Sequence, residues 1–162
     1  MNSVTLYSEF IENVRIIQRI HQIQSHLGWD QETIMPPKGA EARGETLAWL
    51  AGEAHSRLTD TRMGQMLDEL EECSGELEIN QVVNVREIRR AYDKATLLPA
   101  EFVEKMTKIR SEAIHIWQDA RAKSDFGAFQ PILQKVIDLT REKIAYLEDK
   151  ETPYDTLLDE FE

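Results

Sequence analysis

Apolar residues recur at steps of three and four along almost the whole chain, and no stretch alternates apolar and polar residues over a strand length. The first of these patterns is typical of amphipathic helices, whereas sheets need the second. We therefore predict an all-α fold, an antiparallel multi-helix bundle of about six to seven helices with no sheet. We expect residues 1–162 to form a single helical domain.

Turn and cap residues divide this pattern into separate helices. Gly28 is a plausible left-handed stop for the first helix, and Pro36-Pro37 predicts a loop over residues 29–39. Ser124 is a good N-cap for a late helix, and Pro131 near its first turn should be tolerated. The predicted helices cover about 5–27, 40–58, a short segment after a Thr59 or Asp60 cap, 76–97, a segment with Pro99 in its first turn, a segment capped by Ser124, and 154–161.

Large side chains around the proline pair are assigned to the core. We expect Trp29 and Met35 to fold back onto the first two helices, and Arg43 to pair with Asp30 or Glu32 across the loop. The remaining large residues are interpreted as core rather than as a ligand pocket: Trp49, Trp117, Met63 and Met66.

The charge balance excludes several classes of partner. The 162 residues include 30 acids and 19 bases, a formal net charge of -11, which disfavours nucleic acid and anionic membranes as partners. Two acidic stretches, 68–78 and 148–162, are interpreted as solvated, with a docking tail or cation site as the alternative. The bases at 86–94 indicate a salt-bridged helix face.

The location of the chain is predicted from a few further features. No apolar run reaches the ~18 residues of a membrane span, and the first residues lack the pattern of a secretion signal. A single cysteine, Cys73, which we expect to be inert, fits a reducing compartment. We therefore expect a cytoplasmic protein with no membrane partner.

No catalytic constellation is apparent in the sequence. The four histidines, His21, His26, His55 and His115, include no pair four apart with a glutamate between, the arrangement of helical zinc hydrolases. Glu112 and His115 form a single Glu-x-x-His, whereas a di-metal bundle needs two. We assign no catalytic, metal-binding or substrate-binding residue, and keep a di-metal site at Glu112 and His115 as a minor alternative.

A family resemblance begins at residues 27–43, LGWDQETIMPPKGAEAR, and continues in order through 84–87, 98–99, 117–133 and 154–159. These blocks resemble the N-terminal region of the Taq-type (thermostable) metallocarboxypeptidase family. The signature residues, to which we assign structural roles, are Trp29, Asp30, Met35, Pro36, Pro37, Arg43, Trp117, Asp125, Phe126, Tyr154 and Asp155.

The resemblance implies a larger enzyme. Members of this family are longer helical enzymes that release residues from peptide C-termini, and they are commonly homodimers. They use zinc or cobalt held by a His-Glu-x-x-His helix and a later glutamate, and their fold is similar to that of neurolysin and angiotensin-converting enzymes. Because that metal motif is absent here, we expect no cofactor in this chain and no hydrolysis by the chain alone.

Two interpretations of the chain remain open. It is either a groove-wall scaffold completed by a missing catalytic half, or a free-standing helical interaction module that has lost catalysis and self-associates. In the first case peptides would be substrates only of the full-length enzyme.

Overall fold

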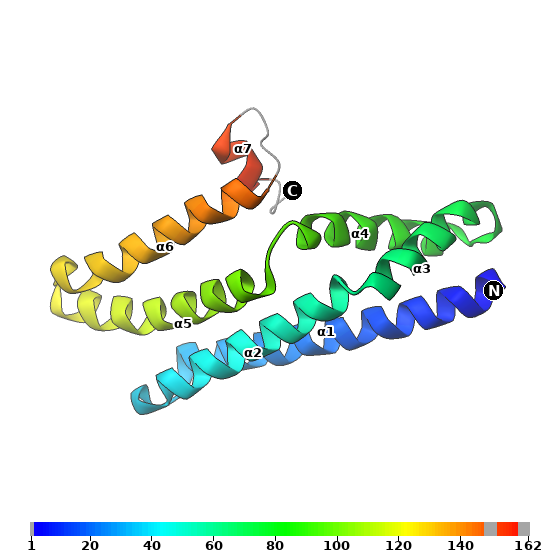
Figure 1. Ribbon diagram of the computed structural model, residues 1–162. Coiled ribbons are helices and arrows are strands. Elements are labelled where there is room, and N and C mark those ends of the chain that lie inside the picture. The colour runs from blue at the N-terminus through cyan, green and yellow to red at the C-terminus, as the bar shows by residue number, and fades with distance from the viewer. Residues whose placement is uncertain (1, 148–151, 159–162) are drawn as a thin grey trace.

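The computed structural model describes residues 2–147 and 152–158, and within these ranges it contains helices and no strand (Figure 1). The all-α prediction is therefore confirmed. The seven α-helices in these ranges are α1 Ser3–Thr33, α2 Ala40–Leu58, α3 Thr61–Glu72, α4 Ile79–Thr96, α5 Ala100–Lys123, α6 Phe126–Tyr146 and α7 Pro153–Leu158. Two short 3-10 helices, Pro37–Gly39 and Ser74–Glu76, lie before α2 and between α3 and α4.

The first helix is longer than predicted, and Gly28 is not its stop. Gly28 lies inside α1 with a negative φ, and beyond its chain neighbours and the adjacent backbone of α1 no atom lies within 4 Å of the position that a Cβ would take there. The helix ends at Thr33, and the Asp30 carbonyl accepts from the Ile34 and Met35 N–H groups before the prolines remove further donors. The predicted loop over 29–39 is thus reduced to a few residues and a 3-10 turn.

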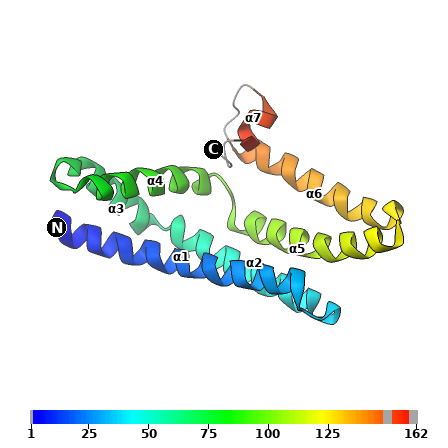
Figure 2. The same ribbon diagram turned by 180° about the vertical axis from the view of Figure 1, so that it is seen from behind.

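Two apolar clusters hold the helices together. The larger lies between α1, α2, α3 and α4, and its most buried side chains are Leu6, Phe10, Met63, Met66, Leu67 and Leu70. The smaller joins α5 to α6 through Phe102, Met106 and Leu139. In both views α5 runs alongside α2, whereas α3 and α4 lie toward the other end of the molecule (Figures 1 and 2).

Helix α2 connects these two clusters because it packs extensively against α5 as well as α1. Its buried face consists largely of small residues, which let two helix backbones approach closely. A Cβ on Gly44 would lie 3.7 Å from Ser111 Oγ, and one on Gly52 would come within 2.2 Å of Glu104 Oε1. The small residues on this face are Gly44, Ala48, Ala51, Gly52 and Ala54.

Several helix ends differ from the prediction. Ser124 is not the N-cap of α6: it is the C-cap of α5, in the left-handed region at φ 53, and Asp125 caps α6 by accepting from the Ala128 N–H. Pro99 is the N-cap residue of α5 rather than a residue of its first turn. Pro131 is tolerated inside α6 as expected, although it lies one turn further along than predicted.

The other ends agree more closely with the sequence. Asp60, one of the two caps considered, accepts from the Arg62 N–H at the start of α3. Helix α4 begins at Ile79, later than predicted, behind a capping box of Glu78 and Gln81. The closing helix ends at Leu158 in the described range, and the rest of the predicted segment, through residue 161, lies outside it.

The tryptophans are not core residues. Trp29, Trp49 and Trp117 are 61%, 64% and 42% exposed, so the predicted burial of all three is wrong. Met63 and Met66 are buried as expected, at 1% each, and Met35 is half-buried. The spacing of apolar residues along a helix does not show which of them lie at the centre of the apolar face and which lie at its exposed edge.

Part of the acidic stretch over 68–78 is ion-paired rather than only solvated. Arg89 of α4 reaches back to α3, where it donates to the carboxylates of Asp68 and Glu71. The predicted salt-bridged face at 86–94 is thereby confirmed. The second acidic stretch, 148–162, lies mostly outside the described residues.

No helix within the described ranges is long and apolar enough to cross a membrane.

Candidate functional site

The first group of signature residues lies where α1 turns into α2. Arg43 extends its guanidinium from α2 to the end of α1, donating from Nη1 to the Leu27 carbonyl and from Nη2 to the Asp30 carboxylate. Its side chain is only 16% exposed. Of the two carboxylates considered for Arg43, Asp30 is the partner, and this ion pair closes the turn.

The proline pair shapes the same turn. Pro36 is extended, with φ -61 and ψ 140, and Pro37 begins the 3-10 helix that leads into α2. The half-buried Met35 side chain packs on Gly39, where a Cβ would lie 3.3 Å from Met35 Cγ. Trp29 does not fold back as predicted, because its side chain is mostly exposed.

A buried polar contact that the sequence did not reveal joins this turn to α5. Gln31 Nε2 donates to the Ser111 carbonyl at 3.1 Å, and Ser111 Oγ donates to Gln31 Oε1 at 3.0 Å. Both residues are 4% exposed. Gln31 continues the three- and four-residue spacing of the buried residues of α1, a signal that was missed because the helix was expected to end at Gly28.

The second group of signature residues lies at the turn between α5 and α6. Trp117, Asp125 and Phe126 line a cavity of about 470 Å³. Arg121 stacks over the Trp117 ring at 5.1 Å, and Phe126 is 64% exposed. The Asp125 carboxylate caps α6 by accepting from the Ala128 N–H.

The last two signature residues lie at the start of α7. Thr152 Oγ1 donates to the Asp155 carboxylate at 2.6 Å and accepts from the Asp155 N–H at 3.2 Å. Tyr154 is 70% exposed. Asp155 therefore fixes a helix start, and Tyr154 presents its ring to the surface.

Zinc or cobalt, the metals implied by the resemblance, do not fit the residues present. In residues 2–147 and 152–158 no three His, Cys, Asp or Glu side chains come together in a way that could hold a metal ion. Glu112 and His115 line a cavity of about 400 Å³ with Glu41 and the cationic Lys108. The buried His115 Nε2 has no hydrogen-bond partner there, and the structure gives the di-metal interpretation no support.

A histidine and a carboxyl group elsewhere in the chain have shifted pKa values with local causes. Burial lowers the pKa of His55, and a backbone hydrogen bond with Leu98 opposes this shift. The hydrogen bond from Arg62 lowers the pKa of Glu9. Neither group lies beside the signature residues.

Comparison with known proteins agrees with the motifs. The profile of the carboxypeptidase Taq (M32) metallopeptidase family matches residues 9–162. Thermostable carboxypeptidase 1 of Thermus thermophilus is 34% identical over 149 residues, covering 91% of this chain and 29% of the relative. The chain thus spans about a third or less of the length of the curated relatives it matches.

Solved structures show the same partial coverage. The BsuCP crystal structure superposes with a TM-score of 0.93 at 28% identity, over 96% of this chain and 31% of the other. Metallocarboxypeptidase 1 of Trypanosoma cruzi superposes with a TM-score of 0.72 at 34% identity, over the same shares of the two chains. The helical arrangement, the ordered signature residues and the profile match agree, and the chain belongs to the carboxypeptidase Taq (M32) metallopeptidase family.

Proposed function

We propose that this chain is the N-terminal helical scaffold of a metal-dependent carboxypeptidase and forms part of its groove wall. The observation that carries the proposal is the family match over residues 9–162, combined with coverage of only 29% of the Thermus thermophilus relative. The signature side chains of the chain serve as ion pairs, caps and exposed faces, which is the chemistry of a scaffold.

Catalysis and metal binding are assigned to residues outside this chain. A divalent ion, zinc or cobalt, would supply Lewis-acid chemistry for peptide hydrolysis in the complete enzyme. Because the residues described here do not fit such an ion, no step of the reaction is assigned to them. The chain alone is expected neither to hold the metal nor to release C-terminal amino acids.

The direct test is an assay of the purified chain. We expect no stoichiometric zinc or cobalt after dialysis and no release of the C-terminal residue from a blocked dipeptide, with an intact family enzyme as the positive control. Stoichiometric metal together with turnover would overturn the inactivity of the isolated chain.

A complementation assay tests the scaffold role itself. The part of Bacillus subtilis carboxypeptidase 1 that this chain does not match would be produced separately and mixed with this chain. We expect activity with the mixture and none with either part. An Arg43→Gln variant, which loses the contacts with Leu27 and Asp30, should restore less activity, whereas Arg15→Gln on the exposed side of α1 should restore as much as the unmodified chain.

Extensive exposed surface supports a second candidate, a cytoplasmic interaction module that forms homodimers. The chain exposes 10477 Å², whereas a compact monomer of its mass, 18.8 kDa, would expose about 8,300 Å². Exposed aromatic residues on several helices belong to this surface. Light scattering over a range of concentrations should show dimers if this candidate holds, and a strict monomer at every concentration would contradict it.

A further inference from the structure

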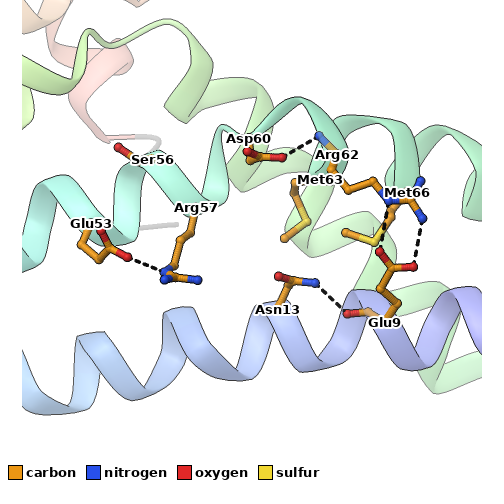
Figure 3. A pocket seen from close by; sticks show the side chains of 9 residues that line it. All are labelled: Glu9, Asn13, Glu53, Ser56, Arg57, Asp60, Arg62, Met63 and Met66. Carbon is orange, nitrogen blue, oxygen red and sulfur yellow. Dashed lines mark hydrogen bonds and ion pairs between the residues drawn. The ribbon is translucent and has the colours of Figure 1, made fainter.

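A charged cavity lies where α1, the end of α2 and the start of α3 meet (Figure 3). Its volume is about 410 Å³, and none of the signature residues line it. Met63 and Met66, each 1% exposed, form its apolar floor. We call it the arginine pocket, defined by Glu9, Asn13, Glu53, Ser56, Arg57, Asp60, Arg62, Met63 and Met66.

The guanidinium group of Arg57 lines this pocket, and its two Nη atoms are hydrogen-bond donors without a partner in the described part of the chain. Its Nε donates to Glu53 Oε1 at 2.7 Å, which orients the guanidinium group. Its two Nη atoms have no protein partner in the described part of the chain, and they point toward α1 across the opening (Figure 3). A planar fork with both outer nitrogens available matches the two oxygens of a carboxylate.

The second arginine is already occupied. Arg62 donates to both oxygens of Glu9, at 3.1 and 2.9 Å, and pairs with Glu69 at 3.4 Å. The lowered pKa of Glu9 follows from the same hydrogen bond. Arg62 therefore closes one wall of the pocket and does not compete with Arg57 for an incoming anion.

Oxygen acceptors lie on the far side of Arg57 from Glu53. Asn13 donates its amide to the Glu9 carbonyl, so its Oδ1 remains available. Asp60 accepts the Arg62 N–H through Oδ1, so its second oxygen remains available. A carboxylate oxygen and an amide oxygen together suit an ammonium group.

The charges of the side chains that line the arginine pocket favour some classes of ligand over others. Three carboxylates, from Glu9, Glu53 and Asp60, face two guanidinium groups. A simple anion would approach three negative charges, and a simple cation would approach two positive ones. A zwitterion, whose two charges meet opposite partners, avoids both penalties.

We propose that the arginine pocket binds a free α-amino acid with an apolar side chain. Arg57 holds the carboxylate through its two Nη atoms, Asp60 and Asn13 receive the ammonium group, and the thioethers of Met63 and Met66 contact the side chain. This site is independent of the proposed carboxypeptidase role, and its failure would leave that role untouched.

The experiment titrates the full chain with L-leucine while the methyl resonances of its methionines are followed by NMR. Two matched ligands each lack one charge: 4-methylpentanoate lacks the ammonium group, and 3-methylbutylamine lacks the carboxylate. We expect saturable shifts of Met63 and Met66 with leucine, and binding at least roughly tenfold weaker for each matched ligand.

Variants locate the site. Arg57→Gln should weaken leucine binding at least roughly tenfold, and Asp60→Asn, which keeps a helix cap, should weaken leucine and the amine but not the carboxylate. Arg86→Gln, on the exposed face of α4, is the matched control and should bind leucine normally. Equal binding of all three ligands, normal binding by Arg57→Gln, or shifts confined to other methionines would each overturn the proposal.

Discussion

Side chains at the α1–α2 turn act through hydrogen bonds more than through apolar burial. Arg43 satisfies a carbonyl and a carboxylate at the end of α1, while the neighbouring Trp29 remains exposed. The Asp30–Arg43 pair is partly buried, with side chains 36% and 16% exposed, so salt screens it less than a surface pair. We expect the Asp30–Arg43 ion pair to fix the direction in which α2 leaves α1.

Replacement by alanine should have opposite effects on stability at two glycines, because one lies in a close helix contact and the other does not. A Cβ on Gly64 would lie 2.5 Å from Tyr92 Oη and 2.9 Å from its ring, whereas Gly28 has open space. We expect Gly64→Ala to lower the free energy of unfolding by about 1–3 kcal/mol, and Gly28→Ala to raise it by about 0.5–1 kcal/mol. Urea unfolding measures both. Equal effects would contradict the α3–α4 approach.

Packing of His55 predicts a pH dependence of stability. Burial lowers its pKa in the folded chain below the value of 6.5 that applies when it is unfolded, so the unfolded chain binds the proton more readily. This contribution to stability is present above about pH 6.5 and is lost as the pH falls from there through the lower pKa of the folded chain. Urea unfolding should show a shallower decline from pH 7.5 to pH 5 in His55→Gln than in the unmodified chain. Exposed His26→Gln is the control, and an identical decline in both variants would exclude this role of His55.

At the scale of elements, the position of a helix end depends on how the backbone N–H and C=O groups that lack a partner within the helix are satisfied. Helix α5 ends with the left-handed Ser124, whose N–H reaches the Arg121 carbonyl, and Asp125 donates its own N–H to the Ala120 carbonyl. The Asp125 side chain then caps α6. Two adjacent residues thus close one helix and open the next.

This arrangement predicts opposite effects at the two positions. Ser124→Gly should raise the free energy of unfolding by up to about 1 kcal/mol, because glycine has no penalty in the left-handed region. Asp125→Ala should lower it by about 1 kcal/mol through loss of the cap. Thermal or urea unfolding tests the pair. If Ser124 were the N-cap of α6, as its residue type suggests, Ser124→Gly would bring no gain and Asp125→Ala little loss.

The contact between α1 and α5 rests on a buried polar pair. Ser111→Ala removes the donor to Gln31 Oε1 at a site that is 4% exposed, and an unpaired buried acceptor costs about 1–3 kcal/mol. Adding Gln31→Leu should cost less than the sum of the single changes, because the two residues share one interaction. Ser8→Ala, whose hydroxyl bonds the Val4 carbonyl at the surface, is the control and should change stability little. Additive losses would show that the pair is not coupled.

At the scale of the whole molecule, two apolar clusters joined by α2 leave several faces uncovered. The exposed large apolar residues lie on six of the seven helices of the described ranges, all except α3. The α1–α2 and α5–α6 turns lie at the same end of the molecule (Figures 1 and 2). Under the proposed scaffold role, these faces are the surface that we expect the rest of the enzyme to cover.

Tryptophan fluorescence tests this at the level of the intact chain. With Trp29, Trp49 and Trp117 at least 42% exposed, acrylamide should quench the isolated chain efficiently. Addition of the complementary part of the Bacillus subtilis relative should protect part of this signal if the scaffold role holds. Complete retention of quenching in an active mixture would place the interface away from all three tryptophans.

The sequence by itself determined the helical class, most helix positions and the family, because helical periodicity, caps and signature blocks are local features. Even the Asp30–Arg43 pair was within reach, since both residues flank one turn. Only the tertiary structure decided that α1 runs through Gly28 and that Gln31 pairs with Ser111, 80 residues away. It also decided which edge of each apolar stripe stays exposed, as at Trp49. These outcomes depend on which helices meet, and that information is carried by contacts between distant segments rather than by neighbours along the chain.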